Sequence, residues 1–169
     1  MIHLHVPSVP ISVNNAYFTK MKRQGKKTVP LRILTEKGKK YKVATKTHLA
    51  RTYPREMRYF KPNVPYVLVI LFVFGDEKAV YNTTWPSKAE SRYKKLDVGN
   101  RLKLFEDALC EATGVDDSHH WCVTVRKEHG PEDATHVWAW NEEDVPNNPI
   151  SDIVRELRNL HAAPAAQPH

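Results

Sequence analysis

The feature that most constrains the fold is an amphipathic helix expected between residues 98 and 113, with acidic residues on both sides of it. Its apolar residues recur at steps of four and three, which predicts one buried face; they are Val98, Leu102, Phe105, Leu109 and Ala112. Gly114 is typical of the residue that ends a helix. Asp97 precedes the helix, and the pair Asp116 and Asp117 follows it. If the chain folds Asp117 back toward Asp97, the carboxylates would form a site for a hard cation.

Length and composition limit the class of protein. A chain of 169 residues fits one domain that can bury a proper core. Its most apolar run, residues 64–74, is far shorter than the roughly 20 residues of a membrane-spanning helix. The first residues lack the charged and apolar regions of a signal peptide, so the expected location is the cytoplasm. The two cysteines, Cys110 and Cys122, are too few for a disulfide framework and are expected to be free thiols.

Charge is distributed unevenly along the chain. Residues 20–61 contain fifteen Lys or Arg and only two acids, whereas residues 128–152 contain seven acids and no Lys or Arg. A basic region of that density, in a chain with a pI near 9.4, is the electrostatic footprint of a polyanion partner, most plausibly nucleic acid. A well-solvated basic surface without such a partner is the alternative interpretation.

The first half of the chain is predicted to contain one strand, one loop and one helix before the central strand. Residues 2–9 alternate as a half-buried strand does, and Asn14 and Asn15 suit a turn or a left-handed conformation. Residues 20–29 are basic and contain few core residues, which predicts a mobile loop that closes over a phosphate backbone. Thr35 is the expected N-cap of a helix that extends toward residue 50.

The central strand is predicted at residues 66–74, because an unbroken apolar run is typical of a strand covered on both faces. A long polar connection, residues 75–95, should then contact DNA or a dimer partner. Its Trp85 is expected to be a hydrophobic anchor, with stacking on an unpaired base as the alternative. Residues 119–127 and 135–140 are predicted to be two strands of a hairpin.

The segment from Asp97 to Asp117 resembles the RusA-type Holliday junction resolvases. Their pattern is Asp-x-Asp-Asn, two residues, Lys, a helix with Asp-Ala-Leu, and a terminal Asp-Asp. Asp97, Asn100 and Lys103 match its first part, while residues 107–109 and 116–117 match the remainder. Gly99 departs from it, because the family usually has its second Asp there. Residues 10–17, with sequence PISVNNAY, also resemble the family's Pro-Ser-Asn-Asn-x-Tyr segment, which suggests a loop at the rim of the active site.

This resemblance implies an α+β fold, a mixed β-sheet with packed helices, in a single RusA-like domain that forms an intertwined homodimer. We expect the domain to span residues 1–145, and residues 146–169 to be a C-terminal extension with a short helix and a disordered tail. The implied activity is Mg²⁺-dependent resolution of four-way DNA junctions by paired nicks, with Mn²⁺ as a possible substitute. By analogy alone, a compact resolvase of this kind suits a phage or prophage.

The resemblance also implies roles for individual residues. The catalytic residues would be Asp97, Lys103 and Asp117, and the metal ligands Asp97, Asp117 and Asp116. Residues expected to contact DNA are Asn14, Asn15, Lys20, Lys22, Arg23, Lys26, Lys27, Lys37, Lys40, Arg92, Lys94, Lys95, Asn100 and Arg101. Lys42, on the same predicted helix as Lys37 and Lys40, is expected to contact phosphate as well.

Each of these residues also has a structural explanation. Asp97 could be a helix N-cap, Lys103 could pair with Asp107 at i+4, and Asp116 and Asp117 could be loop acids. A zinc site formed by Cys110, His119, His120 and Cys122 is disfavoured, because these residues include no Cys-x-x-Cys pair. Gly99 favours a second function, a branched-DNA-binding protein that has kept the fold and lost cleavage. A general basic nucleic-acid-binding module is the third possibility.

Overall fold

The computed structural model describes residues 1–25, 27–75, 98–147, 149 and 153. Its centre is a four-stranded mixed sheet with the strand order β1-β6-β4-β5. The strands are β1 (Ile2–Val6), β4 (Tyr66–Phe74), β5 (His120–His129) and β6 (Ala134–Asn141). β4 pairs with β5 in parallel, and the other two pairings are antiparallel. The predicted α+β fold with a mixed sheet is therefore confirmed.

Strand β4 is the central strand that its apolar run predicts. It lies between β5 and β6, and eight of its nine residues are buried. Side chains of a strand point alternately to opposite faces. Leu68, Ile70 and Phe72 enter the larger core on one face, whereas Val67 and Val69 enter a second cluster on the other.

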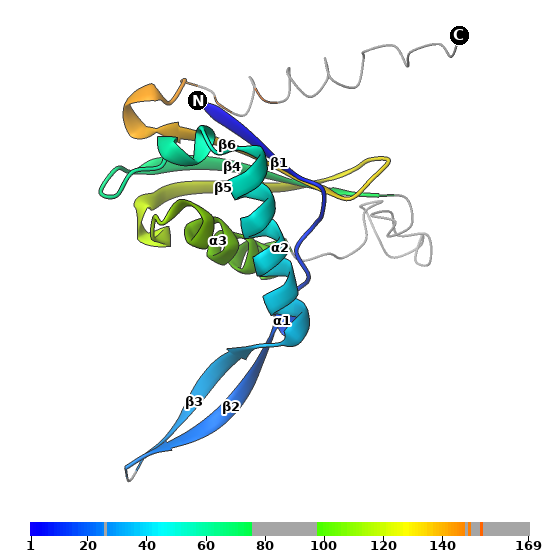
Figure 1. Cartoon of the computed structure of the whole chain (residues 1–169), viewed down its shortest axis with the longest axis vertical. Coiled ribbons are helices and arrows are strands. Elements are labelled where there is room, and N and C mark those ends of the chain that lie inside the picture. Colours follow the sequence, from blue (N-terminus) through cyan, green and yellow to red (C-terminus); the bar gives the residue numbers. More distant parts are fainter. Residues whose placement is uncertain (26, 76–97, 148, 150–152, 154–169) are drawn as a thin grey trace.

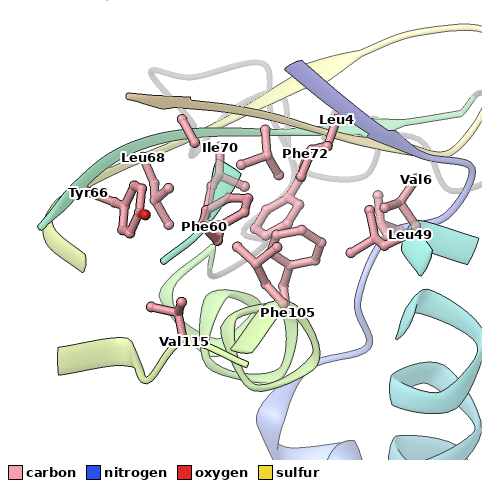
Figure 2. Close-up of a cluster of buried hydrophobic side chains, with 14 of the residues drawn as sticks. Leu4, Val6, Leu49, Phe60, Tyr66, Leu68, Ile70, Phe72, Phe105 and Val115 are labelled. Carbon is pink, nitrogen blue, oxygen red and sulfur yellow. The ribbon is translucent and has the colours of Figure 1, made fainter. Parts of the chain in front are cut away.

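Two helices cover the first face of the sheet, α2 (Glu36–Thr52) and α3 (Gly99–Thr113) (Figure 1). Phe105 of α3 is fully buried and packs edge-on against Phe72 of β4, with 6.2 Å between ring centroids. Leu49 of α2 and Val6 of β1 extend this core beside them (Figure 2). The predicted N-cap of α2 is confirmed, because the Thr35 side chain accepts a hydrogen bond from the backbone N–H of Gly38.

The second face of the sheet carries a smaller apolar cluster. Trp138 and Trp140 of β6 pack there with Val67 and Val69 of β4. Ile153 joins this cluster and is only 4% exposed, so at least one residue of the C-terminal extension packs against the sheet.

The most unexpected element is a β-hairpin, which we call the arm. It consists of β2 (Tyr17–Gln24) and β3 (Lys27–Leu34), which form a separate two-stranded sheet. The arm projects away from the body beyond the short helix α1 (Val13–Ala16) (Figure 1). The prediction of a loop at residues 20–29 is therefore wrong. Its polar residues can form strands because each is paired across the ribbon with the opposite strand.

Several local predictions need correction. Asn14 and Asn15 are in α1, with ordinary helical backbone in place of the expected turn, and the first strand ends at Val6 rather than at residue 9. β5 and β6 do not form a hairpin, because β4 lies between them. The register of β5 on β4 skips Trp121, so a β-bulge interrupts the predicted alternation. His120 consequently contacts α3 from the same side of the sheet as Val123.

The long connection expected at residues 75–95, including Trp85, lies outside the described residues apart from Gly75. No helix in the described ranges is long and apolar enough to cross a membrane.

Candidate functional site

Helix α3 and the turn after it present the acidic site. The helix begins at Gly99 after the N-cap residue Val98, whose side chain forms no capping hydrogen bond among the described residues. It ends at Thr113, and Gly114 follows with φ 74°, a left-handed conformation that glycine adopts without strain. This turn redirects the chain into a short 3-10 helix, η3 (Asp117–His119). Asp117 is thereby brought back toward Lys103 of α3.

Lys103 lies between two carboxylates. Its Nζ is 2.8 Å from Oδ2 of Asp117 and 3.1 Å from Oδ1 of Asp107. The hydrogen bonds to Asp117 and to Asp107 raise the pKa of the Lys103 ammonium above its ordinary value. The side chain is about half exposed, at 49%, so the ammonium remains charged and within reach of a ligand.

Tyr17, the first residue of the arm, contacts the same site. Its hydroxyl donates a hydrogen bond to Oδ2 of Asp107. Burial, followed by this hydrogen bond, raises the pKa of the Tyr17 phenol, which keeps it protonated and able to donate. Asp107 therefore uses one oxygen for the arm and the other for Lys103, and the four groups form a chain from Tyr17 to Asp117.

Several acids lie around Cys110 on α3 and in the turn after it. Burial and then the charges of Asp117, Glu106, Asp107 and Asp116 raise the pKa of the Cys110 thiol to about 12. Cys110 is consequently a neutral free thiol, and it is partly rather than fully buried. A field that disfavours a thiolate at this position favours a cation nearby.

Asp116 has a structural role in the turn. Its side chain accepts a hydrogen bond of 3.0 Å from the backbone N–H of Ser118, so it caps η3. This hydrogen bond holds the pKa of Asp116 below its ordinary value. Asp116 is exposed and lies beside Asp117 at the start of η3.

The sequence of the chain matches one known protein family. The family described as endodeoxyribonuclease RusA matches residues 7–137, which is most of the chain. The chain belongs to the RusA endodeoxyribonuclease family. No individual curated protein matches it. The RusA match spans the arm, both large helices and the site on α3, so the acidic cluster lies inside the region that defines the family.

Some residues implied by the RusA pattern lie outside the described part of the chain. They are Asp97, Lys26, Arg92, Lys94 and Lys95. Asp97 is adjacent in sequence to Val98, the N-cap of α3, and its role as ligand remains a prediction. Gly99, which replaces the second Asp of the RusA pattern, is the exposed first residue of α3.

The basic residues predicted to contact DNA have different environments. Exposed positions on the arm and on α2 are occupied by Lys20, Lys22, Arg23, Lys27, Lys37 and Lys40. Arg101 is half-buried, donates a hydrogen bond to the carbonyl of Pro10, and lies 5.2 Å from the ring centroid of Phe74. This environment favours a structural role for Arg101. Asn100 is half-buried near the start of α3 and also has interaction partners.

Lys42 was predicted to contact phosphate alongside Lys37 and Lys40, and the structure contradicts this. Its Nζ is 2.5 Å from Oε1 of Glu111 on α3, and its side chain is largely buried. The reason is the packing of α2 on α3, which turns this part of the helix toward the body.

Two site residues were not identified as functional from the sequence. In the sequence, Tyr17 is only the last residue of the segment that resembles the family's Pro-Ser-Asn-Asn-x-Tyr pattern. Asp107 belongs to the helix signature and is the i+4 partner of Lys103 in the structural explanation, a pair that the structure shows. The i+4 spacing of Lys103 and Asp107 was a usable signal. Nothing in local periodicity connects Tyr17 to a residue 90 positions later.

The described part of the site presents carboxylate oxygens, the type of ligand that a hard divalent cation prefers. Asp107 and Asp117 place carboxylate oxygens around one position, and in this structure the Lys103 ammonium supplies the positive charge between them. Among the residues that the structure describes, no group of three or more His, Cys, Asp or Glu could hold a metal, and this includes the disfavoured zinc set. Mg²⁺ commonly uses only one or two protein carboxylates and completes its shell with water and substrate phosphate.

Proposed function

We propose that this protein is a Mg²⁺-dependent, structure-specific endonuclease that resolves four-way DNA junctions by paired nicks. The observation that carries the proposal is the charge-paired lysine: Lys103 is held by Asp107 and Asp117 on the helix where the RusA pattern places its lysine and acids.

Asp117 and Asp97 would hold the metal ion, with Asp116 contributing through its second oxygen or a bridging water. When bound, Mg²⁺ would polarise the scissile phosphate and lower the pKa of a coordinated water. Lys103 would bind a non-bridging or leaving oxygen of that phosphate, where its fixed positive charge stabilises the negative charge that develops during in-line displacement. Its raised pKa keeps this charge present throughout the physiological pH range.

Asp107 would position Lys103. With one oxygen held by Tyr17, Asp107 offers its other oxygen to the ammonium from a fixed direction. Lys103 is thereby oriented toward Asp117 and the substrate rather than extended into solvent. A catalytic cation that is already oriented does not have to be ordered during the reaction.

The substrate would be held largely through its phosphates. The exposed lysines of the arm and α2 make a basic surface, and acids are absent from the arm. Such contacts position DNA without reading its sequence. A homodimer would present two equivalent sites, which suits two symmetric nicks in one junction.

Cleavage of a labelled synthetic four-way junction, measured beside a linear duplex of the same sequence, tests this proposal. Each substrate is incubated with Mg²⁺ or EDTA and with the natural protein, Asp117→Asn or Asp97→Asn. Asp144→Asn is the matched control, because Asp144 is an exposed acid in η4 (Glu142–Asp144), outside the residues that the RusA family matches. We expect Mg²⁺-dependent paired nicks on the junction alone, lost in both site variants and retained in the control.

Junction binding without nicks in any divalent metal would contradict the enzyme proposal. Gly99 would then favour the second function, a branched-DNA-binding protein. Gly99→Asp sharpens this test, because it restores the missing carboxylate at the start of α3, where an acid is also favoured by the helix dipole. Cleavage that emerges only in Gly99→Asp would assign the natural chain to the binding function.

A further inference from the structure

The arm exposes apolar side chains that the rest of the domain does not cover. A two-stranded hairpin alone is marginally stable in water. This arm is not covered by the four-stranded sheet or its helices, and it extends into solvent (Figure 1). It nevertheless exposes large apolar side chains: Phe18 is 49% exposed, Met21 60% and Leu31 39%.

The register divides the arm into two different faces. Directly opposed residues of an antiparallel pair point to the same side. Phe18 opposes Ile33, Lys20 opposes Leu31, and Lys22 opposes Val29. This side, which we call the Phe18 face, therefore carries two lysines on β2 beside a column of apolar residues on β3.

On the opposite side, which we call the Met21 face, both arginine side chains already contact other groups of the arm. Arg32 lies 5.3 Å from the ring centroid of Tyr17, and Nε of Arg23 donates to the carbonyl of Gly25. On the Phe18 face, Lys20, Lys22 and Lys27 are exposed and form no ion pair or side-chain hydrogen bond with any described residue. The unpartnered face is thus the one that combines free positive charge with apolar surface.

We propose that the Phe18 face of the arm docks into a groove of duplex DNA flanking the cleavage site. The major groove admits a two-stranded β-ribbon. Lysines on one column can reach the phosphates of the groove wall, while Phe18 and Leu31 contact sugars and base edges. This inference rests on the proposed function, and it adds a contact remote from the scissile phosphate.

Charge selects DNA over a second copy of the arm. Residues 17–34 contain six Lys or Arg and no acid. Two such ribbons packed face to face would repel each other, whereas a polyanion would be attracted and would release counterions. Eight residues of strand extend about 26 Å, which corresponds to about eight base pairs of duplex.

The test measures binding without cleavage, by fluorescence anisotropy in EDTA, on junctions whose arms are either about 6 or about 20 base pairs long. The variant Phe18→Ser with Leu31→Ser alters the Phe18 face, and Met21→Ser is the matched control on the opposite face. We expect the natural protein to bind the long-armed junction about tenfold more tightly than the short-armed one. The double variant should lose this difference, and Met21→Ser should keep it.

A second variant covers the case in which the serine substitutions unfold the ribbon. Lys20→Gln with Lys22→Gln should reduce the slope of log affinity against log salt by about 2, since each lysine would neutralise one phosphate. Equal affinity of both junctions for the natural protein, or an equal loss in Met21→Ser, would overturn the proposal. A shift from dimer to monomer in sedimentation of the double variant would overturn it too, by assigning the face to a second copy.

These outcomes separate the two claims. If binding depends on the arm but no nicks form in Mg²⁺, the proposed nuclease activity is wrong and the proposed docking of the arm on DNA is supported. If the Phe18-face variants nick long-armed junctions as the natural protein does, the nuclease activity is supported and the docking of the arm is contradicted.

Discussion

The central sheet and the arm are both β-structure, and they are stabilised in different ways. In β4 nearly every side chain is buried, so the strand is specified by the apolar surface that it removes from water. In the arm most side chains are exposed, and the ribbon is held by cross-strand pairs and by the contact of Tyr17 with Asp107. The sheet therefore accounts for most of the buried apolar surface of the fold, whereas the arm contributes little to it. The arm contacts the site on α3 through the hydrogen bond from Tyr17 to Asp107.

The same substitution in the two regions should have very different effects. Phe105→Ala removes a fully buried ring from the core and is expected to lower the free energy of unfolding by about 3–5 kcal/mol. Phe18→Ala removes a half-exposed ring from the arm and is expected to change it by about 0.5 kcal/mol. Urea denaturation followed by circular dichroism measures both. Comparable losses would mean that the arm is part of the cooperative core.

Lys103 should matter for cleavage and little for stability. We expect Lys103→Gln to reduce the single-turnover cleavage rate by roughly 10²–10³, the usual cost of losing one preorganised electrostatic contact. Lys39→Gln is the control, because Lys39 also pairs with an acid, Glu36, on an exposed helix surface. A cleavage rate within twofold of natural protein would remove Lys103 from the reaction.

Tyr17 tests the connection between arm and body. Tyr17→Phe deletes the hydrogen bond to Asp107 and is expected to cost about 1 kcal/mol of stability. The single-turnover cleavage rate should also fall several-fold at saturating protein, with junction affinity unchanged. The reason is that Asp107, no longer held by Tyr17, does not orient the Lys103 ammonium. Tyr59→Phe is the comparison: it deletes a hydrogen bond from the backbone N–H of Asn141, away from the site. An equal decrease in rate for both variants would indicate a general loss of structure.

The smallest effect concerns pH. Burial and then the nearby His48 lower the pKa of His5 in β1. The unfolded chain therefore binds this proton more readily, so His5 favours folding above its ordinary pKa of about 6.5, and this contribution is lost as pH falls below it. His5→Asn should flatten the decline in unfolding free energy between pH 7 and 5 by a few tenths of a kcal/mol. Phe18→Ala should leave the decline unchanged, because the arm contains no His or acid.

Sequence alone predicted the elements whose determinants are local. The apolar run of β4, the Thr35 cap and Gly114 each act through neighbouring residues, and all three are confirmed. The arm was missed because its strands have little buried surface, so no alternation of apolar and polar residues marks them. The order of β4, β5 and β6 depends on pairing between distant segments, which local patterns do not encode.

The candidate site divides in the same way. Lys103, Asp107 and the Asp116–Asp117 turn belong to one helix and its C-terminal cap, so their spacing was informative. Tyr17 lies 90 residues before Asp107 in the sequence, and the two meet only in the folded chain. Its contribution is a property of tertiary structure.

Mapping of the nicks at nucleotide resolution tests the central claim most directly. A four-way junction labelled in turn on each strand is incubated with the natural protein and Mg²⁺, and the products are separated on a sequencing gel. Two nicks at symmetry-related positions on opposing strands, absent with Asp117→Asn, are the result that a paired junction endonuclease predicts. Nicks scattered along all four strands, or an uncut junction that remains bound, would contradict it.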